Sequence, residues 1–192
     1  MIKKNENLKK VVIAAPQLHR HKVTLKIGKW KKYFDSNYVS TIIAMALNDF
    51  DDKIFFFING YLITSQNLYL VVQTAEIEKD QMVSKIEAKI VLLLKKNPQK
   101  PKDSHSEISL VADDKSLFNI IRKPLFEIYP LENDHLVKLI TGQKVTLPYF
   151  DQNLKDLKTL IHNHPFCSAI NYLGGISPVK VTLYKDHIES EE

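Results

Sequence analysis

Two apolar segments joined by a short polar turn are the sequence feature that most constrains the fold. Residues 53–64 and 67–74 are rich in aromatic and branched side chains, and only two residues separate them. Such segments are typical of central strands in a sheet, and so short a connection predicts that they pair antiparallel. The dipeptide Asn59-Gly60 could form a hairpin turn or a bulge. We favour a bulge, because the chain reverses better at residues 64–66.

The elements around this strand pair predict the fold class. Residues 21–27 alternate polar and apolar side chains, which predicts a strand with one buried face. Apolar positions at helical spacing over 39–50 and 76–96 predict two helices, and Asp35 offers an N-cap for the first. The order is therefore strand, helix, strand, strand, helix. It predicts an α+β fold, a ferredoxin-like antiparallel sheet with helices packed on it.

The rest of the chain predicts extensions of this one domain, which we expect to span residues 1–192. Residues 1–20 form a basic lead-in, and residues 97–106, rich in Lys, Pro and Ser, form an exposed loop. Residues 107–192 are expected to be a mainly helical C-terminal part. The elements expected there are a short strand at 107–112, helices at 113–123, 133–141 and 151–162, and a final edge strand at 179–184.

The net charge of +5 is unevenly distributed along the chain. Residues 1–32 carry ten Lys and Arg against one Glu, a net +9, and the other 160 residues carry 17 basic and 21 acidic groups, a net −4. A basic end on a slightly acidic body indicates a polyanionic partner, because Lys and Arg contacts to phosphate release counterions. The alternative is a solvated basic tail.

Composition and motifs exclude several classes of protein. The single cysteine, Cys167, rules out an internal disulfide framework and a multi-cysteine zinc site, and it favours the reducing cytoplasm. No run reaches about 18 apolar residues, so no membrane span is expected. Phosphate-binding loops, dinucleotide fingerprints and nucleophile elbows are also missing from this sequence, which has only five glycines.

Three segments together resemble a known family. Residues 21–25 are followed by Tyr33-Phe34-Asp35; residues 61–72 read Tyr-Leu-Ile-Thr-Ser-Gln-Asn-Leu-Tyr-Leu-Val-Val; and residues 149–165 end in His-Asn-His-Pro. They resemble the HUH-type tyrosine transposases, in particular the REP-associated kind. That family's strand pair typically reads Tyr-Val-Ile-Met-Pro-Asn-His-Val-His-Leu-Leu-Val, and one of its helices ends in Tyr-Ile-His-x-Asn-Pro.

The resemblance implies a metal site whose ligands are replaced here. In the family, two histidines on alternate strand positions share a face and hold a divalent metal with a third polar ligand. The matching positions are Asn67 and Tyr69. An amide carbonyl is a modest ligand, and a neutral phenol with a pKa of about 10 is a poor one. We therefore expect no cofactor; a divalent metal such as Mg²⁺ is expected only if the protein still cleaves DNA. Without a metal, Asn67 and Tyr69 are ordinary strand residues, or Tyr69 stacks on a base.

The family's nucleophile is a tyrosine that attacks a DNA phosphate and forms a covalent phosphotyrosine. Tyr129 lies in the region where that tyrosine is expected, but it precedes Pro130 and is not on a convincing helix. Tyr149 is the runner-up, although it matches a family position that is not the nucleophile. The alternative is that both tyrosines are packing residues.

Two pairs of histidines could also be considered as metal ligands. His19 and His21 lie two residues apart at a strand entrance and could share a face, but no carboxylate or cysteine is nearby in the sequence. His162 and His164 have the same spacing at the end of a helix, where such residues do not face each other. Neither pair predicts a metal site, and we expect Cys167 to be a buried structural thiol.

These observations lead to three hypotheses of function. The first is a transposase-like protein that binds single-stranded or hairpin DNA without metal-dependent cleavage. The DNA-binding residues expected for it are Lys22, Lys26, Lys29, Lys31 and Lys32. The second is an active transposase that nicks single-stranded DNA through Tyr129 at a non-standard site. The third is a protein-interaction or homodimerisation module that retains only the fold.

Overall fold

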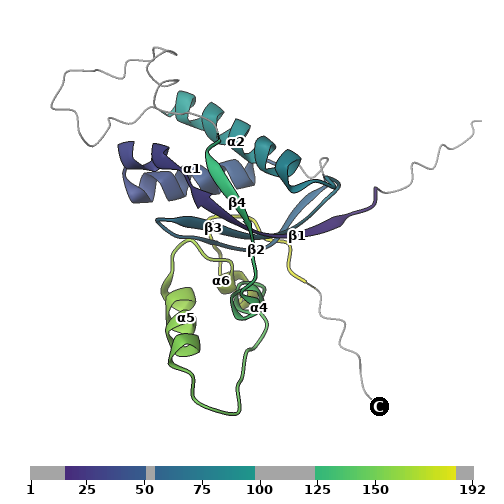
Figure 1. Ribbon diagram of the computed structural model, residues 1–192, viewed down its shortest axis with the longest axis vertical. Helices are drawn as coiled ribbons and strands as arrows, with labels where there is room; N and C mark the ends of the chain where they lie inside the picture. Colours follow the sequence, from purple (N-terminus) through teal and green to yellow (C-terminus); the bar gives the residue numbers. More distant parts are fainter. Residues whose placement is uncertain (1–15, 51–54, 98–123, 185–192) are drawn as a thin grey trace, which may run out of the picture.

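A four-stranded antiparallel sheet forms the centre of the protein (Figure 1). The computed structural model describes residues 16–50, 55–97 and 124–184. The strands are β1 (His19–Ile27), β2 (Phe56–Ile63), β3 (Asn67–Thr74) and β4 (Phe126–Pro130), and they lie in the order β2-β3-β1-β4. This is the order of the ferredoxin-like fold, so the predicted fold class is confirmed.

Two helices cover one face of this sheet (Figure 1). They are α1 (Ser36–Asn48), whose N-cap Asp35 accepts a hydrogen bond from the backbone NH of Asn37, and α2 (Lys79–Lys96). Alternate strand residues such as Val23, Leu25 and Leu70 point toward them and are fully buried. The sheet therefore buries one side chain in two here, as the period-two pattern predicts.

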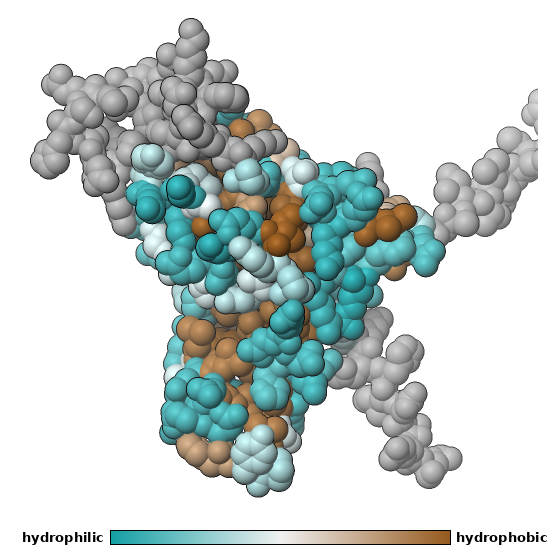
Figure 2. All heavy atoms as spheres, in the orientation of Figure 1, coloured by the Kyte–Doolittle hydropathy of each residue, from teal (hydrophilic) through white to brown (hydrophobic). Residues whose placement is uncertain are grey.

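The opposite face is covered over only part of its width. Three helices lie on this side: α4 (Asp134–Ile140), α5 (Gln152–Asn163) and the short α6 (Ala169–Tyr172). A second apolar cluster joins Leu62 and Val71 of the sheet to Leu136, Ile140 and Ile161 of these helices. Figure 2 shows further apolar surface over this C-terminal part. The cluster covers β2 and part of β3 and leaves the β1–β4 side to polar residues.

The predicted bulge is confirmed and allows α4 to approach the sheet. The register between β2 and β3 shifts between Ile58 and Gly60. A Cβ atom on Gly60 would lie 2.9 Å from the carbonyl oxygen of Ile140 and 2.9 Å from Cγ2 of Thr141. Only glycine leaves room for this contact between the strand and the end of α4.

The structure corrects two expectations about the C-terminal part. Strand β4 was not predicted, because its five residues Phe-Glu-Ile-Tyr-Pro carry a weak pattern that ends in proline. The expected edge strand at 179–184 is wrong: these residues form no strand, although the NH of Thr182 donates to the carbonyl of Ile58 at 2.7 Å. The strand predicted at 107–112 and the helix predicted at 113–123 lie outside the described residues, as does the 97–106 loop except for Asn97.

Candidate nucleic-acid interface

The register of the sheet brings the family-matched positions and Tyr129 onto one face. Tyr69 of β3 lies opposite Thr24 of β1, and Thr24 lies opposite Tyr129 of β4. Residues paired across antiparallel strands point to the same side. The two tyrosines therefore flank Thr24, roughly 10 Å apart by two strand spacings. The resemblance pointed to Tyr129 by its place in the sequence, but the strand that carries it was not predicted.

The neighbouring row holds the charged part of this face. Asn67 lies opposite Lys26, and Lys26 lies opposite Glu127. We call the six residues of the two rows the open face: Thr24, Lys26, Asn67, Tyr69, Glu127 and Tyr129. Lys26, Glu127 and Tyr129 are exposed, and the other three are half-buried.

Asn67 and Tyr69 contact each other directly. The side-chain NH₂ of Asn67 donates to the hydroxyl oxygen of Tyr69 at 3.1 Å. This confirms that the two positions share a face, as the alternation of a strand requires. The side chains leave only an amide carbonyl and a phenol hydroxyl as candidate metal ligands, and these do not fit the divalent metal that the resemblance implies. Among residues 16–50, 55–97 and 124–184, no group of three or more His, Cys, Asp or Glu side chains could hold a metal ion.

Glu127 connects Lys26 to Tyr129. Its Oε2 accepts a hydrogen bond from Lys26 Nζ at 2.9 Å and another from the Tyr129 hydroxyl at 2.8 Å. The bond from Lys26, and then the bond from Tyr129, lower the pKa of the Glu127 carboxyl. The same carboxylate raises the pKa of Tyr129. Tyr129 is therefore a neutral hydrogen-bond donor with 46% of its surface exposed, which is the opposite of an activated nucleophile.

A short 3-10 helix, η1 (Lys29–Tyr33), places three lysines beside the open face. Its Trp30 is 2% exposed and its indole NH donates to the Leu125 carbonyl at 3.1 Å, which anchors η1 to the start of β4. Lys29 and Lys32 are exposed. Lys31 Nζ donates to the Ser65 carbonyl at 3.0 Å and to the Gln66 side chain in the β2–β3 turn.

The lysines around the open face influence one another. Burial lowers the pKa of Lys31, and the charges of Lys26 and Lys32 lower it further. Lys22, on β1, lies 3.8 Å from the Asp134 carboxylate. All five lysines predicted from the sequence to bind DNA thus lie on β1 or η1, and two of the five are paired with a carboxylate. Sequence reasoning missed Glu127, because β4 was not predicted.

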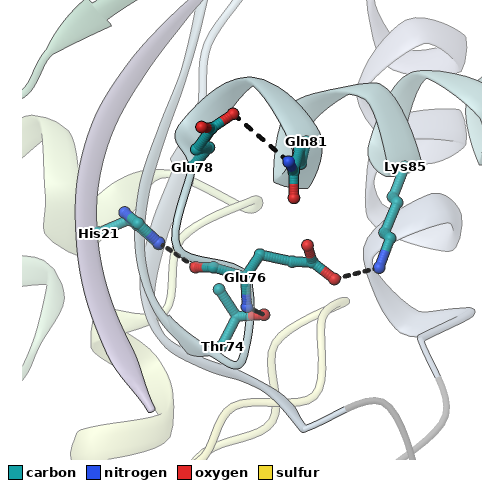
Figure 3. A network of polar contacts seen from close by, with 6 residues as sticks. All are labelled: His21, Thr74, Glu76, Glu78, Gln81 and Lys85. Carbon is teal, nitrogen blue, oxygen red and sulfur yellow. Dashed lines mark hydrogen bonds and ion pairs between the residues drawn. The ribbon is translucent and has the colours of Figure 1, made fainter. Parts of the chain in front are cut away.

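The other candidate residues lie elsewhere. His21 is buried, and its Nε2 donates to the Glu76 carbonyl at 2.8 Å, beside the ion pair of the Glu76 carboxylate with Lys85 (Figure 3). This is a structural role, and it fixes the proton on Nε2. Tyr149 is exposed in the loop before α5.

The two histidines near the end of α5 do not act as a pair. His164 Nδ1 accepts a hydrogen bond from the Phe166 NH at 3.2 Å, and burial lowers the His164 pKa. His162 is exposed and lines a cavity of about 590 Å³ between α5, α6 and the loop after α4. Cys167 is 1% exposed, and burial raises the pKa of its thiol to about 11.

Comparison with known proteins adds no family to this description. The chain matches no protein-family model, no curated protein and no solved structure. None of the helices in the described part of the chain is both long and apolar enough to cross a membrane.

Proposed function

We propose that this protein binds single-stranded or hairpin DNA in the cytoplasm, along the open face and the lysines of η1, and that it is a transposase-like protein without metal-dependent cleavage. The observation that carries the proposal is that Tyr69 and Tyr129 lie on one sheet face beside five lysines. A four-stranded sheet whose aromatic side chains stack on bases is a recurring way to hold unpaired strands.

The charges on this side support a contact to the phosphate backbone. Lys29 and Lys32 are exposed on η1, just after the end of β1. A DNA strand that crosses the open face would pass these two lysines. A site that neutralises three to five phosphates on single-stranded DNA gives a slope of about −2 to −3.5 in a plot of log K against log salt. Binding should therefore weaken steeply with salt.

The chemistry of the same residues argues against cleavage. Asn67 and Tyr69 replace the histidine pair of the resembled family and are hydrogen-bonded to each other. The raised pKa of Tyr129 disfavours the phenolate that a nucleophile requires. Both features disfavour DNA cleavage, and neither removes the tyrosine rings or the lysines that we propose to bind DNA.

The test is fluorescence anisotropy with labelled dT oligonucleotides and a hairpin DNA, over about 25–200 mM salt, the range in which phosphate contacts dominate. The double variant Lys29→Gln/Lys32→Gln should lose at least about tenfold in affinity. The matched control, Lys79→Gln/Lys96→Gln on α2, makes the same change in net charge on the opposite side of the sheet. It should lose less than threefold in affinity, because salt screens exposed charges that lie far from the bound DNA. Equal losses in the two variants, or no binding at low salt, would contradict the proposal.

The competing functions give different readouts. An active transposase should form a covalent adduct with hairpin DNA in Mg²⁺ or Mn²⁺, and Tyr129→Phe should remove it. A dimerisation module should elute as a dimer in size-exclusion chromatography with light scattering and show no salt-dependent DNA binding. Tyr129→Phe should leave DNA binding within about threefold under our proposal, because the ring that stacks is retained.

A further inference from the structure

One carboxylate lies at the centre of the proposed binding surface and bonds two of its donors. Glu127 Oε2 accepts from both Lys26 Nζ and the Tyr129 hydroxyl, at 2.9 and 2.8 Å. Lys26 and Glu127 have 53% and 52% of their side-chain surfaces exposed, so the ion pair faces solvent. A phosphate oxygen would accept the same two hydrogen bonds in the same way.

We propose that Glu127 occupies the position of a phosphate on the open face, so that a DNA strand reaches Lys26 and the Tyr129 hydroxyl only by displacing the Glu127 carboxylate from them. Glu127 thereby sets how tightly the surface holds a strand. This inference rests on the proposed DNA binding.

The position of Glu127 explains why it competes rather than assists. On the described part of the open face, Glu127 is the only acidic residue, and it lies in the row with Lys26. Its ion pair cancels the charge of the one lysine that lies between Asn67 and the β4 edge. A strand that brings a phosphate to Lys26 must also approach the Glu127 charge, and like charges in contact repel.

The position also predicts which lysines act first. Lys29 and Lys32 lie on η1, and neither forms an ion pair with a carboxylate of the described residues. A DNA strand can contact these two lysines without breaking the hydrogen bonds of Glu127 to Lys26 and Tyr129. Lys26 becomes available only when the carboxylate moves, which requires a rotation of an exposed side chain.

The experiment measures affinity for a labelled dT oligonucleotide at fixed low salt. Glu127→Gln keeps the size of the side chain and removes its charge, and it should raise affinity at least about fivefold. Glu132→Gln is the matched control: it makes the same charge change at an exposed residue five positions along the chain, and it should change affinity less than twofold because exposed charges beyond the contact are screened.

A double-mutant cycle then assigns the effect to Lys26. Lys26→Gln should weaken binding only slightly in the wild-type background and at least about fivefold in the Glu127→Gln background, because only there is the lysine free to meet a phosphate. Thermal melting verifies that the variants fold.

The outcomes separate the two proposals. If the wild type binds DNA and Glu127→Gln leaves the affinity unchanged or lowers it, the role of Glu127 is overturned but DNA binding stands. The same holds if Glu132→Gln raises the affinity as much as Glu127→Gln does. Tight binding only in Glu127→Gln supports both proposals. No binding in any variant overturns the proposed function itself.

Discussion

The side-chain NH₂ of Asn67 lies 3.1 Å from the hydroxyl oxygen of Tyr69 and donates a hydrogen bond to it. Two side chains that are two positions apart in β3 thus meet on one face of the sheet. This geometry is what a pair of metal-binding histidines would need, although neither residue is a good ligand.

The first prediction places a histidine pair at these two positions. The double variant Asn67→His/Tyr69→His should bind Co²⁺ or Zn²⁺ at least about tenfold more tightly than the wild type, because two imidazoles on one face can share an ion. Isothermal titration calorimetry measures the change. Each single variant serves as a control and should remain close to wild type; a single variant that matches the double would mean that the two positions do not share a site.

The second prediction concerns the buried carboxylate that holds β4. Glu87 of α2 is 5% exposed, and its Oε1 accepts hydrogen bonds from the backbone NH groups of Leu125 and Phe126 at 2.6 and 3.1 Å. Glu87→Ala leaves both groups without their acceptor and should lower the free energy of unfolding by about 2–4 kcal/mol. Glu87→Gln keeps an acceptor oxygen and should cost less. Urea denaturation tests this, and equal losses in the two variants would contradict it.

The third prediction concerns the contact of the bulge with α4. Gly60→Ala places a methyl group 2.9 Å from the Ile140 carbonyl oxygen and from Thr141 Cγ2, and it should destabilise the protein by about 1–3 kcal/mol. Thr141→Ser removes that methyl neighbour and keeps the hydroxyl that donates to the Val137 carbonyl at 2.7 Å. It should therefore recover part of the loss in the double variant. Additive destabilisation in chemical denaturation would show that the two residues do not meet.

The fourth prediction concerns the reactivity of Cys167. The thiol is 1% exposed and its pKa is about 11, so at pH 8 only about one molecule in a thousand carries the reactive thiolate. Iodoacetamide should label the folded protein very slowly. Labelling should become rapid in urea, where the pKa returns to its ordinary value. Fast labelling without denaturant, followed by mass spectrometry, would place the thiol at the surface.

The sequence predicted three of the four strands and the two helices α1 and α2 because their patterns are local. Alternation in 21–27, the apolar runs of 53–64 and 67–74 and the helical spacing of 76–96 each report burial on one face, and burial repeats with the period of the backbone. The structure has β1, β2, β3 and α2 at these places. The bulge beside Gly60 was also predicted, because the chain reverses at residues 64–66 and a hairpin turn at Asn59-Gly60 was therefore not needed.

Strand β4 depended on contacts far away in the chain. Phe126–Pro130 is short and carries no strong alternation, so its sequence alone does not distinguish a strand from a loop. It pairs with β1, a hundred residues earlier, while Glu87 and Trp30 fix the segment where it begins. Residues 179–184 show the reverse. They alternate like a strand, but their hydrogen bonds to β2 are isolated and do not continue as a ladder.

The sequence by itself determined the fold class and the position of Asn67 and Tyr69 on one face of a strand, because residue identity and period suffice for these. Only the tertiary structure decided that Tyr129 and Glu127 join them on one face, and that Glu127 bonds Lys26. The physical reason is the pairing register, which sets which side chains of distant strands are neighbours.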